Sequence, residues 1–303
     1  MEYVLTADSL CKRYGHNRVL DGLSMRVPKG AVYGLVGKNG AGKTTLIRLI
    51  CGLQEPTSGS FTLYGADSRQ KGIEKARRRM GAVVETPSLY PFFSAEENLR
   101  QQYRILGKPS FEGIPKLLEL VGLQGTGSRK VKHFSLGMKQ RLGIAVALAG
   151  DPDLLVLDEP VNGLDPQGII GIRELILKLN REFQITVLIS SHILDELSKL
   201  ATHYGFLDGG RMVKEVSAEA LEMSFRRCLQ VEVTDTGALA RVLEEMGAEY
   251  KILSESRADI YADLNITKLV TALLKEGCEL FSVREREESL ESYYLNLMGG
   301  KRS

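Results

Sequence analysis

The residues with the clearest chemical meaning form a glycine-rich segment, GKNGAGKT, at Gly37–Thr44. An apolar stretch, Val32–Val36, precedes it, and leucine and isoleucine recur at helical spacing after it, over Thr44–Gly52. Glycines allow a backbone to wrap around phosphate with successive N–H groups pointing inward. The lysine of such a loop reaches the β- and γ-phosphates, and the hydroxyl that follows it binds Mg²⁺. The segment predicts a site for a nucleoside triphosphate.

We expect the whole loop and the next residue to contact that nucleotide. These residues are Gly37, Lys38, Asn39, Gly40, Ala41, Gly42, Lys43, Thr44 and Thr45. Lys43 is also expected to act in catalysis, and Thr44 to bind the metal. The alternative is a glycine-rich turn without a ligand. The position of the loop between a strand and a helix argues against that alternative.

A second feature is a pair of acids that ends an apolar run, LLVLDE, at Leu154–Glu159. Sheets of α/β proteins bind ligands outside the carboxyl ends of their strands, so a strand end is a suitable place for these acids. Asp158 would hold Mg²⁺, usually through water, and Glu159 would polarise the attacking water. By themselves, four apolar residues followed by two acids are weak evidence for a metal and nucleotide site. The phosphate loop upstream makes this evidence strong.

A third feature is FSLGMKQRLGIAVALAG, Phe134–Gly150, in which a polar turn with Ser135 and Gly137 leads into an apolar helix. The first N–H groups of a helix lack partners and the dipole is positive there, so this helix start is a candidate anion site. The alternative is an ordinary N-capped helix. The chain would then carry two phosphate-binding features about a hundred residues apart.

Strand-like and helical segments alternate through residues 30–215, which predicts an α/β fold with a parallel sheet covered on both faces. Residues 1–30 alternate as antiparallel strands do, and Gly81–Glu85 is a further expected strand. The pattern changes near residue 225. From there, strands and helices follow the order βαββαβ and end in a helix over Glu288–Leu297, which predicts a ferredoxin-like domain. We expect domains at 1–220 and 225–303.

The composition is that of an ordinary globular protein. The 303 residues are 43% hydrophobic and 26% charged, with a net charge of +2, so no nucleic-acid partner is expected. The four cysteines lie far apart without metal-site spacing and are expected to be reduced thiols. The N-terminus lacks an apolar signal segment, and no run approaches the roughly 20 apolar residues of a membrane span.

The ordered motifs resemble those of the ATP-binding-cassette ATPases. The phosphate loop, FSLGMKQR, LLVLDEP, NGLDP and SSH follow one another over about residues 3–215. GAVVETPSLYPFFSAEENL and FSLGMKQR are similar to the drug-exporter branch, which includes bacitracin and lantibiotic resistance transporters. The resemblance implies a P-loop NTPase core with a mixed or parallel sheet, an antiparallel β subdomain, a helical signature subdomain and a small α+β C-terminal domain.

The resemblance also implies roles for particular residues. Two cassettes would pack head to tail, as a homodimer or pseudo-dimer, so that Ser135 and Gly137 of one contact the ATP held by Lys43 of the other. Tyr14 would stack on adenine, although a strand-end aromatic in the core is the alternative. Asp165 would lie in a loop at the dimer interface. His192 would contact the γ-phosphate as a switch, although a lone histidine after a strand is usually structural.

Two positions depart from the pattern of the family. Most cassettes carry glutamine where this chain has Glu85, which would be a harder metal ligand and would add negative charge near the phosphates. We expect Glu85 still to sense metal and γ-phosphate. The signature reads Ser-Leu-Gly-Met in place of Ser-Gly-Gly-Gln, so Leu136 stiffens the turn and Met138 removes a polar contact. Ser135 and Gly137 are retained, and so is the expected anion site.

The expected function is Mg²⁺-dependent ATP hydrolysis that powers export of a peptide, antibiotic or lipid-like molecule through a separate membrane permease. The chain would lie in the cytoplasm, peripheral to the cell membrane. One alternative is a soluble non-transport cassette that acts on a nucleic-acid or ribosomal partner, although no long coiled coil or second cassette is visible. Another is a small-molecule kinase, which would need neither FSLGMKQR nor SSH. The resemblance implies that the surface near Glu85–Gly107, with Tyr90, Phe92 and Phe93, docks the permease, although by themselves these aromatics could belong to the core.

Overall fold

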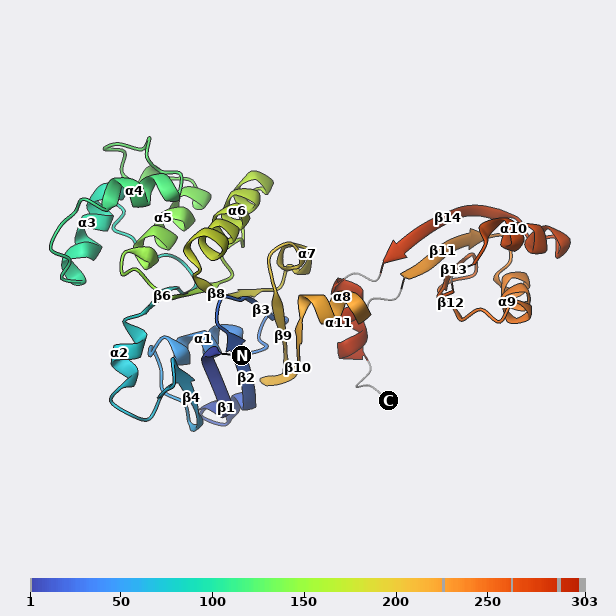
Figure 1. Cartoon of the computed structure of the whole chain (residues 1–303), viewed down its shortest axis with the longest axis horizontal. Coiled ribbons are helices and arrows are strands. Elements are labelled where there is room, and N and C mark those ends of the chain that lie inside the picture. Colours follow the sequence, from blue (N-terminus) through green and yellow to red (C-terminus); the bar gives the residue numbers. More distant parts are fainter. Residues whose placement is uncertain (1, 225–226, 263, 288–289, 300–303) are drawn as a thin grey trace. The chain divides into compact units, whose positions relative to one another are not determined.

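The structure is a computed structural model that describes residues 2–224, 227–262, 264–287 and 290–299. The chain forms two compact units, Met1–Glu219 and Ala220–Ser303 (Figure 1). Helix α8 (Ala218–Ser224) spans the division between them. No helix in these described ranges combines the length and the apolar character that crossing a bilayer requires.

A six-stranded sheet forms the centre of the first unit, in the order β10-β9-β3-β8-β7-β6. Its strands are β3 (Val32–Val36), β6 (Met80–Val83), β7 (Leu154–Asp158), β8 (Thr186–Ser191), β9 (His203–Asp208) and β10 (Arg211–Ser217). In this sheet β9, β3, β8, β7 and β6 each run parallel to the next strand in that order. The edge strand β10 runs antiparallel to β9. Every residue of β3, β7 and β8 is buried, which accounts for their mainly apolar sequences. The carboxyl ends of β3, β6, β7 and β8 consequently meet at one edge.

A second, antiparallel sheet has the order β2-β1-β4-β5. It contains β1 (Tyr3–Tyr14), β2 (Asn17–Pro28), β4 (Ser58–Leu63) and β5 (Ala66–Asp67). Helix α1 (Lys43–Ile50) places Leu46, Ile47 and Leu49 in the core that this sheet shares with β3 and β7. Burial of these three side chains contributes about 1.5–3 kcal/mol each relative to exposure. The helix that begins at the phosphate loop is thereby fixed between the two sheets.

The remaining helices of the first unit are α2 (Ile73–Arg77), α3 (Ala95–Ile105), α4 (Ile114–Leu120), α5 (Leu136–Leu148), α6 (Pro166–Phe183) and α7 (Leu194–Ser198), with a 3₁₀ turn at Val131–His133. In Figure 1, α3–α6 gather on the side of the central sheet opposite α1 and the antiparallel sheet. A capping box starts α3, because Ser94 Oγ accepts from Glu97 N–H and Glu97 accepts from Ser94 N–H.

The second unit contains a four-stranded antiparallel sheet in the order β12-β13-β11-β14. Its elements are β11 (Arg227–Val233), α9 (Thr236–Glu245), β12 (Tyr250–Ile252), β13 (Arg257–Ile260), α10 (Ile266–Lys275), β14 (Leu280–Glu287) and α11 (Leu290–Gly299). Val231, Leu239 and Leu269 are fully buried, one from the sheet and one from each of α9 and α10. This order and pairing is the ferredoxin-like arrangement. Glu288, the first residue of the expected last helix, lies outside the described residues.

The predicted fold class is confirmed: the first unit has the mixed sheet, the antiparallel sheet and the helical part, and the second is α+β. The predicted strand at Gly81–Glu85 was wrong at its end, because β6 stops at Val83. Glu85 adopts φ = 59°, in the left-handed region, which extended backbone does not allow. The expectations did not include the β9–β10 hairpin, whose strands are joined by the Gly209-Gly210 turn.

Candidate functional site

The candidate site lies where β3, β7 and β8 end. A cavity of about 200 Å³ opens there. It is lined by Val19, Lys38, Asn39, Gly40, Gly42, Lys43, Thr44, Thr45 and Glu159. The structure thus brings the glycine-rich loop together with an acid more than a hundred residues away in sequence. Both belong to the carboxyl edge of a parallel sheet, where α/β proteins bind ligands.

Two glycines of the loop are required by close packing. A Cβ on Gly37 would lie 2.7 Å from the carbonyl oxygen of Leu207. Gly42 has φ = 109°, and its Cβ would lie 2.8 Å from the Leu20 side chain. The adjoining turn is equally tight, because Gly210 N–H donates to the Ala41 carbonyl at 3.1 Å. The loop is therefore held between β2 and the β9–β10 turn.

Helix α1 begins at Gly42 without a side-chain cap or an acidic residue in its first turn. The first amides of a helix have no acceptor within the helix, and the dipole makes this end positive. The N–H groups at the start of α1 therefore face the cavity as donors. An anion such as a nucleotide phosphate matches this end of the helix.

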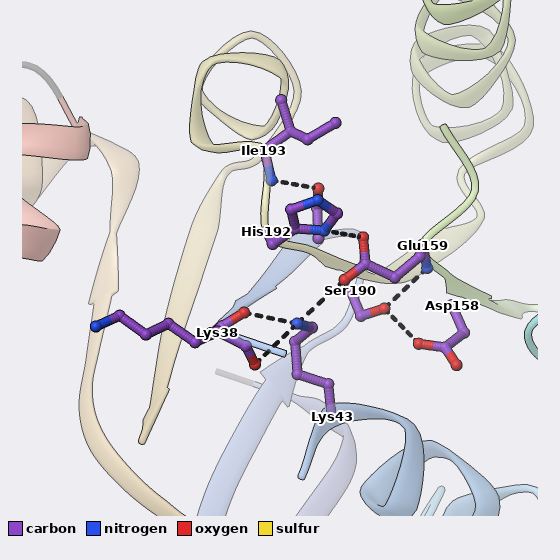
Figure 2. Close-up of polar contacts among 9 residues, drawn as sticks. Lys38, Lys43, Asp158, Glu159, Ser190, His192 and Ile193 are labelled. Carbon is purple, nitrogen blue, oxygen red and sulfur yellow. Dashed lines mark hydrogen bonds and ion pairs between the residues drawn. The ribbon is translucent and has the colours of Figure 1, made fainter. Parts of the chain in front are cut away.

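Lys43 carries a buried charge, with a side chain only 5% exposed. Its Nζ lies 2.6 Å from the Gly37 carbonyl, 3.4 Å from the Lys38 carbonyl and 3.1 Å from Glu159 Oε1. The Glu159 oxygen has no partner with hydrogen-bond geometry, so its pairing with Lys43 is electrostatic. Figure 2 shows the Lys38 side chain directed away from this cluster while its carbonyl faces Lys43. Of the two lysines, only Lys43 carries its charge into the site.

Glu159 is held in a strained conformation at the end of β7. Its φ is 49°, and its N–H donates to the carbonyl and the hydroxyl of Ser190 at 3.2 and 2.9 Å. Its other carboxylate oxygen lies 2.8 Å from His192 Nδ1. Figure 2 shows Glu159 between Lys43 and His192. A carboxylate in this position can orient water for attack on a phosphate bound by the loop.

The turn that carries His192 is fixed on both sides. Ser191 Oγ accepts from Ile193 N–H at 2.9 Å. Beyond it, Glu196 of α7 pairs with Arg173 of α6 at 2.7 Å. Burial alone would raise the pKa of Glu196, but the ion pairs with Lys199 and Arg173 lower it overall. Glu196 therefore stays charged, and it ties the helix after His192 to the helix after Asp165.

The expected metal ligands are only partly together. Asp158 is 1% exposed, and its Oδ1 accepts from Ser190 Oγ at 2.6 Å, while Thr44 lines the nearby cavity. Hydroxyl and carboxylate oxygens beside a phosphate site fit Mg²⁺, which takes one or two carboxylates plus phosphate oxygens. Glu85 instead forms an ion pair with Arg48. Across the described ranges, no three His, Cys, Asp or Glu side chains gather so as to hold a metal by themselves.

Ser135, Gly137 and Asp165 line a different cavity of about 450 Å³, which shares no lining residue with the first. Ser135 caps α5 by accepting from Met138 N–H at 3.2 Å. Asp165 caps α6 by accepting from Gly168 N–H at 3.1 Å. Both caps leave a positive helix start at this second cavity. The chain thus has two separate helix starts that are candidate anion sites.

Tyr14 lies at the end of β1 with 43% of the residue exposed. Its hydroxyl donates to Gln54, and the Lys12 ammonium lies 5.2 Å from its ring centroid. The ring does not line the cavity of the phosphate loop. An exposed aromatic face remains available for stacking, as the adenine role requires.

Sequence reasoning missed three residues of this region. Ser190 joins Asp158 to the Glu159 backbone, Arg48 pairs with Glu85, and Val19 lines the loop cavity. The SSH motif contains Ser190, and its hydroxyl at a strand end was a signal that could have been used. Burial raises the pKa of the Cys51 thiol to about 12, with smaller opposing effects of Arg77 and Asp158, so this thiol stays protonated near neutral pH.

This fold and site define a nucleotide-binding ATPase of the α/β class with a phosphate loop. A sequence profile of the ABC transporter family matches residues 20–162. The chain is 38% identical to the bacitracin transport ATP-binding protein BcrA of Bacillus licheniformis over 99% of both chains. It is 42% identical to the lantibiotic transport ATP-binding protein SrtF of Streptococcus pyogenes, over 72% of this chain and 93% of that protein.

Among solved structures, cbiO1 from Clostridium perfringens, part of the ABC transporter complex cbiONQ, matches with a TM-score of 0.65 at 25% identity. The match covers 82% of this chain and 97% of that one. The chain belongs to the ATP-binding proteins of the ABC transporters. It is an ATPase of that family, and its resemblance to the bacitracin and lantibiotic exporter branch is confirmed.

Replacing Lys43 by alanine removes the only lysine ammonium that lies within the cluster of Figure 2. We expect Lys43→Ala to raise the Kd for ATP about 10- to 100-fold, since a charged hydrogen bond contributes about 1.5–3 kcal/mol. Equilibrium dialysis with labelled ATP measures this. Lys178→Ala, at an exposed position of α6, is the matched control and should change the Kd by less than about twofold. Unchanged affinity in Lys43→Ala would contradict the assignment.

Replacing Glu159 by glutamine keeps the shape of the side chain and removes its charge. We expect Glu159→Gln to lower kcat for ATP hydrolysis by about 10²- to 10⁴-fold, because a general base is lost, while ATP still binds. Phosphate release and ATP binding are measured on the same preparation. Glu182→Gln, at the exposed end of α6, serves as the control. Wild-type turnover in Glu159→Gln would sink the role of this residue.

Proposed function

We propose that this ATPase powers export of a peptide antibiotic through a separate membrane permease, by ATP-driven closure of a head-to-tail dimer. The observation that carries the proposal is the separation of the two anion-binding features into cavities without a common lining residue. One copy has the lysine and the carboxylate at the first cavity and a capped, positive helix start at the second. Two copies facing each other would complete both sites.

In this proposal each residue has a defined task. Lys43 and the amides at the start of α1 would neutralise the phosphates, and Thr44 and Asp158 would hold Mg²⁺, which would supply further positive charge there. Glu159 orients water for attack, and His192 keeps that carboxylate in place. Ser135 and Gly137 bind the γ-phosphate held by the other copy, with Asp165 near the interface. Glu85 senses the metal and the phosphate. Positioning and charge neutralisation account for the reaction.

The cargo is inferred from relatives. BcrA is named for bacitracin transport and SrtF for lantibiotic transport, and both molecules are peptide antibiotics. Identity to BcrA runs through both units of this chain, whereas SrtF matches over 72% of it. We therefore favour a bacitracin-like peptide over a lantibiotic and infer a role in antibiotic resistance. The soluble-cassette alternative has no supporting feature in the described parts of the chain.

A groove beside the aromatic surface supports docking of a permease. It has a volume of about 470 Å³, and its lining combines the apolar residues Leu53, Met80, Val84, Leu89 and Val146 with polar ones such as Arg77 and Gln102. Leu89 lines this groove, and the aromatic residues that follow it in sequence are exposed: Tyr90 by 48%, Phe92 by 69% and Phe93 by 39%. Exposed aromatics are typical anchors of protein interfaces. Such docking would place the chain on the cytoplasmic face of the membrane.

The dimer can be tested with a charge at the second cavity. Gly137 has open space for a side chain, with the nearest atoms 3.9 Å from a built Cβ. We expect Gly137→Asp, in a Glu159→Gln background, to weaken ATP-dependent dimerisation at least about tenfold, because its carboxylate would face phosphate. Sedimentation velocity measures dimerisation. Gly72→Asp, in open space before α2, should dimerise normally. Equal dimerisation of both variants would refute the paired sites.

Permease docking can be tested with a charge on the aromatic surface. Tagged Glu159→Gln protein with ATP and Mg²⁺ should retain a stoichiometric multi-span protein from detergent-solubilised native membranes. Adding Phe92→Asp should remove that protein, because a charge is buried poorly at an apolar interface. Phe183→Asp, on a residue 52% exposed at the end of α6, is the matched control and should retain it. A soluble homodimer without any membrane protein would favour the soluble-cassette alternative.

A further inference from the structure

The acid that departs from the usual glutamine is paired within the chain. Glu85 Oε1 accepts from Arg48 Nη2, and the two side chains are 56% and 34% exposed. Arg48 belongs to the last turn of α1, the helix that begins at the phosphate loop. The groove described above confirms that the two segments adjoin, because Cys51 and Leu53, after α1, line it together with Val84, Thr86 and Pro87.

Electrostatics favour Arg48 as the partner of Glu85 at this position. The carboxyl end of a helix carries partial negative charge, which disfavours a neighbouring carboxylate. Glu85 nevertheless lies beside the last turn of α1, and Arg48 in that turn supplies the compensating charge. Glutamine, being neutral, would not need such a partner at this position.

The pairing also keeps Glu85 apart from the phosphates. Thr44 is in the first turn of α1, where the phosphates are expected, and Arg48 lies four residues later. Four residues correspond to about 6 Å along a helix axis. In addition, Glu85 does not line the cavity of the phosphate loop, whereas Glu159 does. The carboxylate is thus held toward the opposite end of the helix from the nucleotide.

We propose that Arg48 is a positioning residue that holds Glu85 away from the nucleotide, so that Glu85 reaches the metal and the γ-phosphate only by giving up this ion pair. The proposal rests on the proposed function of the site. The ion pair is suited to exchange because it is solvent-exposed, and exposed pairs contribute only about 0.2–1 kcal/mol. Arg48 would then set how strongly Mg²⁺ and nucleotide binding are coupled.

The test measures the coupling of metal and nucleotide without hydrolysis. The Kd of the full chain for adenylyl imidodiphosphate is determined with Mg²⁺ and with EDTA. The coupling factor is the Kd in EDTA divided by the Kd in Mg²⁺. We expect Arg48→Gln to raise this factor about two- to fivefold, because Glu85 no longer has to leave a partner. Arg48→Lys keeps the charge and should restore the wild-type factor.

Two comparisons show whether the effect passes through Glu85. In a Glu85→Gln background, Arg48→Gln should leave the coupling factor unchanged. Arg100→Gln, which breaks an exposed pair with Glu96 of similar exposure on α3, is the matched control and should also leave it unchanged. Thermal unfolding of each variant checks that the fold is intact.

The outcomes separate this inference from the proposed function. An unchanged coupling factor in Arg48→Gln would overturn the role of Arg48. An equal change caused by Arg48→Gln in the Glu85→Gln background would overturn it as well. In both cases nucleotide binding in every variant would leave the proposed function standing. Absence of nucleotide binding in the wild-type chain would overturn the proposed function and this inference with it.

Discussion

The buried charge of Lys43 is the constraint around which the site is organised. An ammonium group that is 5% exposed requires acceptors, since burying an uncompensated charge is strongly unfavourable. Two loop carbonyls and Glu159 surround it. The loop must therefore fold back over its own lysine, and β7 must end beside it. The parallel sheet provides both conditions by aligning the carboxyl ends of β3, β7 and β8.

The same constraint explains why carboxylates and hydroxyls gather near this edge. Ser190 donates to Asp158 and accepts from the Glu159 backbone, so one hydroxyl fixes both acids. His192 then bonds the side chain of Glu159. The contacts run from β8 to β7 to the phosphate loop, as Figure 2 shows. Connected hydrogen bonds hold these side chains more rigidly than separate ones would, and catalysis of phosphoryl transfer depends on such positioning.

Contiguous motifs made much of this predictable from sequence. The loop, the Asp158-Glu159 pair and the SSH segment each keep their residues together, and strand periodicity places them at one sheet edge. Interactions between distant residues were harder to foresee. The Arg48–Glu85 pair joins residues 37 apart, and no local pattern indicates it. The end of β6 was misjudged because hydrophobicity continues to Val84, whereas the positive φ of Glu85 depends on tertiary context. The Arg48–Glu85 pair and the end of β6 depend on contacts with distant parts of the chain, which the local sequence does not reveal.

The turn at Gly209–Gly210 has a mechanical consequence for the whole chain. Gly210 donates to Ala41 of the phosphate loop, and its carbonyl accepts from Asp21 N–H at 3.0 Å. A Cβ on Gly210 would lie 2.3 Å from the Val19 carbonyl oxygen, so the turn has no room for a larger residue. From this turn the chain continues through β10 directly into α8 and the second unit. The chain thus enters the second unit from a hairpin whose turn is hydrogen-bonded to the phosphate loop. An insertion, tag or protease cut at that hairpin would loosen the phosphate loop, although the hairpin lies outside every nucleotide-binding motif.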